Sequence, residues 1–215
     1  RGEDGVHRLR GRTWVEHRVA VTTADGAVTP RRFRVTGGGF WQVHPAAAQT
    51  LLDAVLAATA PRVGERVVDL YSGAGLFTAA AALAVGQRGA VLGLESDPRA
   101  CADARRNLHD LAQVRLEQGR VERRLSALIA QEPWSTSADV VILDPPRAGA
   151  GRAVMETIVG LRPRVVAYVA CDPASLARDL ATAAGLGYRL TALRAFDLFP
   201  MTHHVESLAT LEPTP

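Results

Sequence analysis

A cysteine at the end of a predicted strand is the residue with the clearest potential for chemistry. Cys171 directly follows the apolar segment 165–170, and Asp172-Pro173 behind it is typical of a helix start. Because the positive end of a helix dipole lowers the pKa of a nearby thiol, Cys171 is a candidate nucleophile. An inert buried cysteine is the commoner alternative. This is our interpretation of Cys101, which lies inside a predicted helix with no motif around it.

A glycine-rich turn indicates a nucleotide-like ligand. Gly73 and Gly75 follow the first apolar strand, where glycines let the backbone pass close to a ligand and the next helix presents free N–H groups. Glu95 ends the next strand, and a carboxylate there can accept both ribose hydroxyls of an adenosine group. A dinucleotide fingerprint would carry a third glycine where Thr78 stands, so the pattern favours S-adenosylmethionine over NAD. The alternative is that the two glycines only form a tight turn.

A second polar turn ends the fourth predicted strand. Asp144 is followed by Pro-Pro and Arg147, and the prolines stiffen the backbone that carries this acid. An aromatic residue after Asp-Pro-Pro would suggest methylation of an exocyclic amine, because its ring stacks on the base. Arg147 at that place argues against such a reaction.

The elements that must position these residues form an α/β pattern. Strands that alternate with helices predict a doubly wound, mostly parallel sheet, with ligands at the carboxyl ends of its strands. The last two strands have no helix between them, which predicts one antiparallel strand at the end of the sheet. Seven strands are expected, at residues 67–71, 90–95, 114–118, 139–143, 165–170, 188–196 and 205–211.

The first part of the chain has a different pattern. Residues 13–23 and 31–41 alternate polar and apolar side chains around an Asp25-Gly26 turn, which predicts a short antiparallel piece. We therefore divide the chain into a partial N-terminal β subdomain, 1–44, and a catalytic domain, 45–215. The abrupt start suggests a fragment of a longer protein.

Composition and charge narrow the class of protein. Hydrophobic residues make up 47% of the chain, no apolar run approaches the roughly 20 residues of a membrane span, and no signal-peptide region stands at the start. We expect a cytoplasmic protein with no membrane contact. The two cysteines form no CxxC pair or Cys/His array, so no metal site is expected.

Positive charge is concentrated near the start of the sequence. Residues 1–36 carry eight arginines against four acids, whereas the rest of the chain is nearly neutral. A basic patch beside an enzyme domain suits a polyanion such as RNA. The alternative is a compositional bias, because every basic residue of the chain is an arginine.

The polar turns belong to longer motifs. The segment 168–179 (YVACDPASLARD) resembles the nucleophile motif of the RNA uracil-5-methyltransferase family, and segments 40–45, 144–149 and 197–206 are similar to three more of its motifs. The resemblance implies a Rossmann-like class I methyltransferase fold. It further implies S-adenosylmethionine as methyl donor and carbon 5 of a uridine in tRNA or rRNA as the acceptor.

The resemblance also implies a role for single residues. Cys171 would add to carbon 6 of the uracil, and Glu206 would take the proton from carbon 5. Asp172 stands where the family usually has Asn, and its charge is expected to raise the pKa of Cys171. Contacts to S-adenosylmethionine are expected at Gln42, Tyr71, Gly73, Gly75, Leu76, Glu95 and Asp144, although Leu76 replaces a common Asn.

Two alternatives stay open. The chain could methylate another RNA atom without a thiol adduct, or it could be a catalytically silent RNA-binding module. Neither the motifs nor the composition indicate an obligate protein partner.

Overall fold

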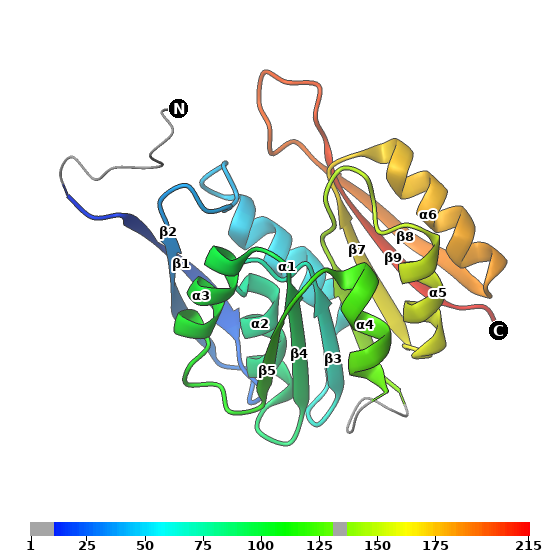
Figure 1. Cartoon of the computed structure of the whole chain (residues 1–215), viewed down its shortest axis with the longest axis horizontal. Coiled ribbons are helices and arrows are strands. Elements are labelled where there is room, and N and C mark those ends of the chain that lie inside the picture. Colours follow the sequence, from blue (N-terminus) through cyan, green and yellow to red (C-terminus); the bar gives the residue numbers. More distant parts are fainter. Residues whose placement is uncertain (1–10, 131–136) are drawn as a thin grey trace.

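A seven-stranded sheet with helices on both faces forms the body of the molecule (Figure 1). The computed structural model describes residues 11–130 and 137–215. The strand order is β5-β4-β3-β6-β7-β9-β8, as expected for a doubly wound sheet. The strands are β3 (Arg66–Leu70), β4 (Ala90–Glu95), β5 (Val114–Gln118), β6 (Val140–Leu143), β7 (Val165–Ala170), β8 (Tyr188–Phe196) and β9 (Glu206–Pro213).

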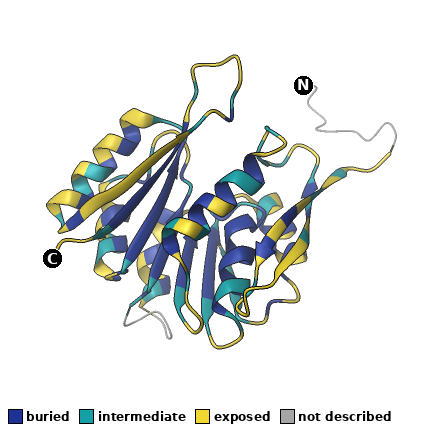
Figure 2. Cartoon of the chain, turned by 180° about the vertical axis from the view of Figure 1, so that it is seen from behind, coloured by how far each residue is buried: buried dark blue, intermediate teal, exposed yellow. Residues whose placement is uncertain are grey.

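Each face of the sheet has its own hydrophobic core. Alternate strand residues point to opposite faces, so neighbouring apolar residues of one strand feed different cores. On β6, Val140 and Ile142 join the first core, whereas Val141 and Leu143 join the second. The first core packs under α1 (Ala47–Thr59), α2 (Leu76–Val85) and α3 (Pro98–Asn107), and the second under α4 (Val121–Ile129), α5 (Arg152–Gly160) and α6 (Pro173–Gly185). Figure 2 shows the central strands buried between these layers.

The predicted antiparallel strand is confirmed. β9 lies between β7 and β8 and runs antiparallel to both of them. Ala170 pairs with Ser207 at the last position of the β7–β9 ladder. The return of the chain into the sheet therefore brings the start of β9 beside the end of β7.

The N-terminal residues form a hairpin, β1 (Trp14–Thr22) and β2 (Val28–Thr36). Asp25 and Gly26 make its turn as predicted, with Gly26 in the left-handed region. The second strand was expected over 31–41 but ends at Thr36, because Gly39 donates its N–H to the Thr36 carbonyl at 2.8 Å and turns the chain.

The hairpin packs on the body of the molecule. Val19, Val21 and Phe33 are buried in the same core as α1 and α2. The division after residue 44 stays a prediction, but the two predicted parts share one core on this side of the sheet.

Two predicted helix starts are confirmed by their caps. The Asp97 carboxylate accepts from the N–H groups of Arg99 and Ala100, and the Asp172 carboxylate accepts from Ser175 N–H at 2.7 Å. In contrast, α4 and α5 begin without a side-chain cap of their own. Among the described residues, no helix is long and apolar enough to cross a membrane.

Candidate active site

The candidate catalytic residues lie on one face of the sheet. Val169 of β7 and Leu208 of β9 both belong to the core under α1. Continued by two residues in each strand, this alternation puts Cys171 and Glu206 on the same face. They occupy the register position that follows the Ala170–Ser207 pair. Directly opposite residues of an antiparallel ladder have Cβ atoms about 4.5–5.5 Å apart, so the two side chains are neighbours.

Cys171 opens into a small cavity at this edge. The thiol is half-buried, and the cavity has a volume of about 160 Å³. Five of its lining side chains carry polar or ionisable groups. The lining residues are Arg147, Cys171, Asp172, Pro173, His203, His204 and Val205. The cavity therefore brings together the ends of β6 and β7 and the loop before β9.

The predicted lowering of the Cys171 pKa is wrong for the ligand-free structure. Burial raises the pKa of this thiol, and the negative charges of Glu206 and Asp144 raise it further. Arg147 acts in the opposite direction but is the weaker influence. Burial and the acids that the tertiary structure brings to the thiol therefore raise its pKa, despite the position of Cys171 before α6.

Asp172 was expected to raise this pKa, but it is not among the groups with the largest influence on the thiol. Its carboxylate caps α6 by accepting from Ser175 N–H, and this hydrogen bond lowers the pKa of Asp172 itself. The acids that raise the pKa of Cys171 come instead from β9 and from the end of β6. Asp172 thus has a local structural role that an Asn also performs at a helix start.

Glu206 is a buried acid with a pKa suited to proton transfer. Glu206 is only 4% exposed, and burial raises the pKa of its carboxyl to about 7. Within the described part of the chain, no hydrogen bond or ion pair occupies this carboxyl. A free carboxyl with a pKa near neutrality can take up and release a proton under cellular conditions.

Asp144 is a second acid on the same face of the sheet as Glu206. Asp144 follows β6, and the alternation of that strand turns it to the same face as Glu206. Its pKa is raised well above the ordinary value, first by burial and then by the charges of Glu206 and Asp69. Asp69, Asp144 and Glu206 thus form a row of acids along one edge of the sheet.

The glycine loop has the backbone geometry of a ligand-binding turn. Tyr71, Gly73 and Gly75 all have positive φ, at 61°, 55° and 92°. For Tyr71 this is an uncommon conformation that the surrounding structure must hold in place. At Gly75 the φ of 92° favours glycine, and a Cβ there would also require the Leu108 side chain to move, since it would lie 2.7 Å from its terminal carbon.

Glu95 holds the glycine loop in this conformation. One carboxylate oxygen, Oε2, accepts from Gly73 N–H at 2.9 Å. The other, Oε1, accepts from the N–H groups of Ser96 and Asp97. Glu95 therefore has a structural role in the loop, and Oε2 keeps a lone pair for a further donor.

Two buried polar atoms beside the loop have no partner in the described structure. They are Oδ1 of Asp69 and Oγ of Ser72. The other Asp69 oxygen accepts from the Thr78 hydroxyl at 2.5 Å, and burial raises the pKa of Asp69 to about 7. Because buried polar groups are almost always hydrogen-bonded, these two atoms carry unused hydrogen-bonding capacity beside the glycine loop. Asp69 carried a signal in the sequence, as an acid inside an apolar strand.

The remaining predicted contacts are less well placed. Leu76 is buried in the core under α1, where it presents no polar atom. Gln42 is half-buried between β2 and α1, next to Trp41, whose ring stacks on His17 at 4.8 Å. No hydrogen bond among the described residues links Gln42 to the other candidates, so its role stays a prediction.

The loop after Asp144 is fastened to α6 by Asp179. This aspartate is fully buried, and its Oδ2 accepts from Tyr168 O–H and from the N–H groups of Ala150 and Gly151 at 2.8–3.1 Å. Its Oδ1 accepts from Arg178. The carboxylate thus holds the two residues that precede α5, and it ties the loop after β6 to the helix that follows Cys171.

A family model described as tRNA (Uracil-5-)-methyltransferase matches residues 14–213. The chain belongs to this family. The predicted resemblance is therefore confirmed over nearly the whole sequence.

Relatives of this uracil-5-methyltransferase chain include RNA-modifying enzymes. An uncharacterized RNA methyltransferase of Streptomyces avermitilis is 52% identical over 211 residues, which cover 98% of this chain and 46% of the relative. The 23S rRNA (uracil(1939)-C(5))-methyltransferase RlmD of Shewanella sp. strain ANA-3 is 38% identical over 187 residues, which cover 86% of this chain and 40% of that protein. The chain spans less than half the length of these relatives.

Solved structures confirm the class I methyltransferase fold. The tRNA (uracil-54, C5)-methyltransferase of Pyrococcus abyssi, in complex with S-adenosyl-L-homocysteine, has a TM-score of 0.73 and 28% identity, and the match covers 98% of this chain and 48% of that one. Fibrillarin of Aeropyrum pernix, with bound S-adenosyl-L-methionine, has a TM-score of 0.62 at 16% identity, covering 88% of this chain and 92% of that one. The second likeness concerns the fold alone.

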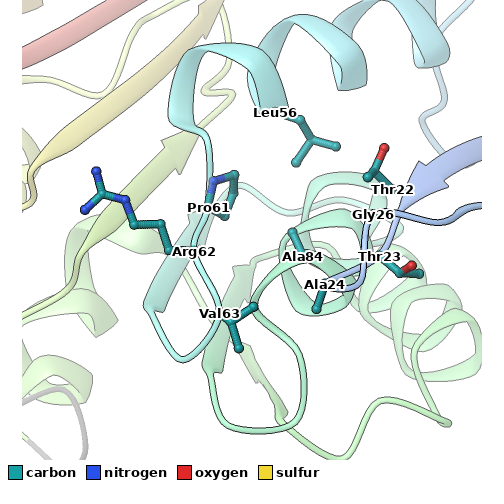
Figure 3. Close-up of a pocket in the computed structure, with 9 residues that line it drawn as sticks. All are labelled: Thr22, Thr23, Ala24, Gly26, Leu56, Pro61, Arg62, Val63 and Ala84. Carbon is teal, nitrogen blue, oxygen red and sulfur yellow. The ribbon is translucent and has the colours of Figure 1, made fainter.

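A second, larger cavity of the uracil-5-methyltransferase chain lies at the opposite end of the parallel strands (Figure 3). It has a volume of about 460 Å³ between the hairpin turn and the C-terminal ends of α1 and α2. Its lining holds no cysteine, histidine or acid, and Arg62 is its one charged residue. The described residues also contain no cluster of three or more side chains that could hold a metal ion.

Proposed function

We propose that this chain transfers a methyl group from S-adenosylmethionine to carbon 5 of a uridine in RNA, through a covalent bond between Cys171 and carbon 6. The observation that carries the proposal is the adjacency of Cys171 and Glu206 across the β7–β9 ladder, on one face of the sheet. Membership of the uracil-5-methyltransferase family and the similarity to enzymes named for uracil C5 methylation support it. An RNA substrate also makes the cytoplasm the expected compartment.

The chemistry needs a nucleophile and a base on the same side of the uracil ring system. Carbon 5 of uracil is a poor nucleophile. When the Cys171 thiolate adds to carbon 6, the electron pair of the C5–C6 double bond becomes available at carbon 5, which would take the methyl group as its bond to the donor sulfur breaks and S-adenosylhomocysteine leaves. Glu206 takes the proton of carbon 5, the double bond reforms, and the C6–S bond breaks to return the thiolate. S-Adenosylmethionine supplies an electrophilic methyl group when bound.

The acid–base properties of Glu206 suit these steps, whereas the raised pKa of Cys171 opposes formation of its thiolate. Glu206, with a pKa of about 7, is substantially ionised at neutral pH and remains basic enough to accept a proton. The Cys171 thiol has a raised pKa and is mostly protonated before substrate binds. Loss of the thiol proton is therefore expected to accompany substrate binding or to require elevated pH.

The methyl donor fits the edge formed by β3, β4 and β6. The N-terminus of α2, the glycine loop and the two unpartnered atoms of Asp69 and Ser72 provide polar groups for the amino-acid part of the donor. Glu95 Oε2 has a free lone pair for a ribose hydroxyl. The predicted contacts of Gln42, Tyr71 and Asp144 belong to this same proposal.

The target base must leave its stack to enter a cavity that also reaches the methyl donor. A single-stranded or flipped uridine is therefore the expected substrate. Whether that uridine belongs to tRNA or to rRNA is tested by offering both unmodified RNAs and mapping the methylated nucleoside by mass spectrometry. A methyl group on any atom other than carbon 5 would favour methylation without an adduct.

RNA that contains 5-fluorouridine tests the covalent route directly. Fluorine cannot leave carbon 5 as a proton, so the adduct should persist and shift the protein on a denaturing gel when the methyl donor is present. Cys101→Ala is the matched control and should form the same adduct, because the Cys101 thiol is buried and donates to the Glu95 carbonyl. Absence of a shifted band for the unmodified protein would contradict the proposal.

A further inference from the structure

The outer face of the β1–β2 hairpin is basic. Its inner face carries Val19, Val21 and Phe33 into the core, so the alternate residues face outward. Register pairs on the outer face are Trp14 with Thr36, Glu16 with Arg34, and Arg18 with Arg32. Glu16 is the one acid among these residues, and it pairs with Arg18 at 3.5 Å in an exposed position where an ion pair is weak.

Arg18 and Arg32 lie directly opposite each other in the ladder. Like charges at directly opposite positions destabilise an antiparallel pair. Both residues are exposed, and the Arg18 side chain is 72% accessible. The presence of two arginines that destabilise the hairpin is explained if a negatively charged partner binds to both of them.

An aromatic ring lies beside this pair. The guanidinium groups of Arg12 and Arg34 lie 4.7 and 4.4 Å from the ring centroid of Trp14. Stacking holds these groups in place while they keep their charge. Within the described residues, no carboxylate pairs with Arg12, Arg32 or Arg34.

Arg31 on the inner face shows what a structural arginine looks like in this hairpin. Its guanidinium donates to both carboxylate oxygens of Asp110 and to the Asn107 carbonyl, so its charge is compensated within the molecule. Among the outer arginines of the described chain, Arg18 has only its exposed pair with Glu16, and Arg12, Arg32 and Arg34 pair with no carboxylate. The difference indicates that the outer charges serve an external ligand.

This face reaches the edge of the sheet that holds the candidate active site. Asn107 accepts from Arg34 N–H at 2.9 Å and donates to the carbonyls of Arg34 and Ala74 at 3.1 and 3.0 Å. Ala74 belongs to the glycine loop. One side chain therefore connects the hairpin backbone at Arg34 to the loop proposed to hold the methyl donor.

We propose that the outer face of the hairpin, formed by Arg12, Trp14, Arg18, Arg32 and Arg34, binds the sugar–phosphate backbone of the RNA outside the nucleotide that enters the Cys171 cavity. The inference rests on the proposed function for the identity of the RNA. Spaced guanidinium groups around an aromatic ring are suited to phosphates and to an unstacked base. The hairpin contacts α3, which packs against β5 at one side of the sheet, whereas Cys171 follows β7 toward the other side, so an RNA that reaches both sites extends over several nucleotides.

The double variant Arg18→Ala/Arg32→Ala tests the proposal. RNA binding is measured by fluorescence anisotropy between about 50 and about 200 mM salt, and the slope of log Kd against log salt should fall by roughly 1.5, as expected for two lost phosphate contacts. The dissociation constant should rise ~10-fold, with a parallel rise in KM for RNA and an unchanged kcat at saturating RNA. Thermal stability should stay equal or increase, because the like-charge pair is removed.

The matched control is Arg152→Ala/Arg189→Ala. It removes two exposed arginines that are paired with Glu156 and Glu212 on other parts of the surface. Its affinity for RNA and its salt dependence should equal those of the unmodified chain. An unchanged Kd and slope in the hairpin variant, or an equal loss in the control, would overturn the assignment.

The test separates this proposal from the proposed function. RNA binding is measured without methyl transfer. Weaker binding by the hairpin variant therefore supports the proposed surface even if the unmodified chain yields no 5-methyluridine. Failure to form 5-methyluridine would contradict the proposed function alone. Normal methylation with unchanged KM in the variant would overturn the surface alone. Competition by polyglutamate as strong as by RNA of equal charge would indicate an acidic protein partner and would also overturn it.

Discussion

The cavity at Cys171 and the cavity near Pro61 lie at opposite ends of the parallel strands and differ in both size and lining. The cavity at Cys171 has about 160 Å³ and gathers a thiol, two histidines, an arginine and an aspartate, with Glu206 behind it. The cavity near Pro61 has about 460 Å³ and is lined mainly by apolar and threonine side chains. The ionisable groups therefore gather at the carboxyl ends of the parallel strands, where helix N-termini and polar turns converge, and not around the larger cavity.

Among the changes at the Cys171 cavity, removal of the thiol should have the largest effect on methyl transfer. Cys171→Ala is expected to lower methyl transfer by at least ~10⁴-fold, because no other group can add to carbon 6. Binding of S-adenosylhomocysteine, measured by calorimetry, should persist since Cys171 lies on a different strand end from the glycine loop. Cys101→Ala should keep activity within about twofold. Full activity in Cys171→Ala would rule out the covalent route.

Removal of the base should arrest the reaction after the adduct has formed. Glu206→Gln is expected to lower kcat by ~10²–10⁴-fold, the usual contribution of a positioned acid or base. Because the carbon 5 proton then stays in place, a covalent complex with ordinary RNA should accumulate on denaturing gels. The thiol pKa, followed by iodoacetamide alkylation against pH, should also fall, since Glu206 is one of the charges that raise it. A higher thiol pKa in this variant would contradict the assignment.

The support of the catalytic edge is tested at Asp179. Asp179→Asn removes a buried carboxylate that accepts from Tyr168, Ala150, Gly151 and Arg178, so the free energy of unfolding should fall by about 2–3 kcal/mol. Urea denaturation gives this value. Activity should fall ~10-fold, because the loop after Asp144 loses its anchor on α6.

Asp172→Asn is the control for this change. Asn also caps a helix, so unfolding free energy should change by less than ~0.5 kcal/mol. If Asp172→Asn lowers the unfolding free energy as much as Asp179→Asn, the hydrogen bonds of Asp179 do not contribute more to stability than a helix cap does.

The row of buried acids makes stability depend on pH. The pKa of Asp69 and the pKa of Glu206 are both about 7 in the folded chain, well above the value of about 4 for these groups in an unfolded chain. Between these values the folded state binds more protons, so its stability decreases as pH rises through this window. Asp69→Asn should therefore raise the unfolding free energy by about 1–3 kcal/mol at about pH 8 and by much less at about pH 5. Equal gains at both pH values would contradict the assigned ionisation.

The smallest effect on methyl transfer is expected at the other cavity. Leu56→Met keeps the volume of a side chain that lines it, so stability should change by less than about 1.5 kcal/mol. The rate of methyl transfer should stay within about twofold. A selective loss of activity with intact stability would show that this edge also takes part in the reaction, and the contrast between the two cavities would fail.

Local sequence signals predicted much of the fold. Asp97-Pro98 and Asp172-Pro173 mark the starts of α3 and α6 because a cap and a first-turn proline act within three residues. The start of α5 has no such mark, because no side chain caps this helix, and Asp179 of α6 instead accepts from the N–H groups of the two residues before it. The three glycines 37–39 end β2 before its alternating pattern does.

The candidate site divides in the same way. Glu95, Asp144 and Cys171 were predicted from their places at strand ends, whereas Gln42 and Glu206 followed only from resemblance to the family. The sequence by itself determined the order of strands and helices and the ends at which polar residues stand, because these depend on neighbours a few residues away. Tertiary structure alone decided that Glu206 lies beside Cys171 and that the thiol pKa is raised. Burial and the charges of β6 and β9 depend on segments far apart in the chain, which no local pattern encodes.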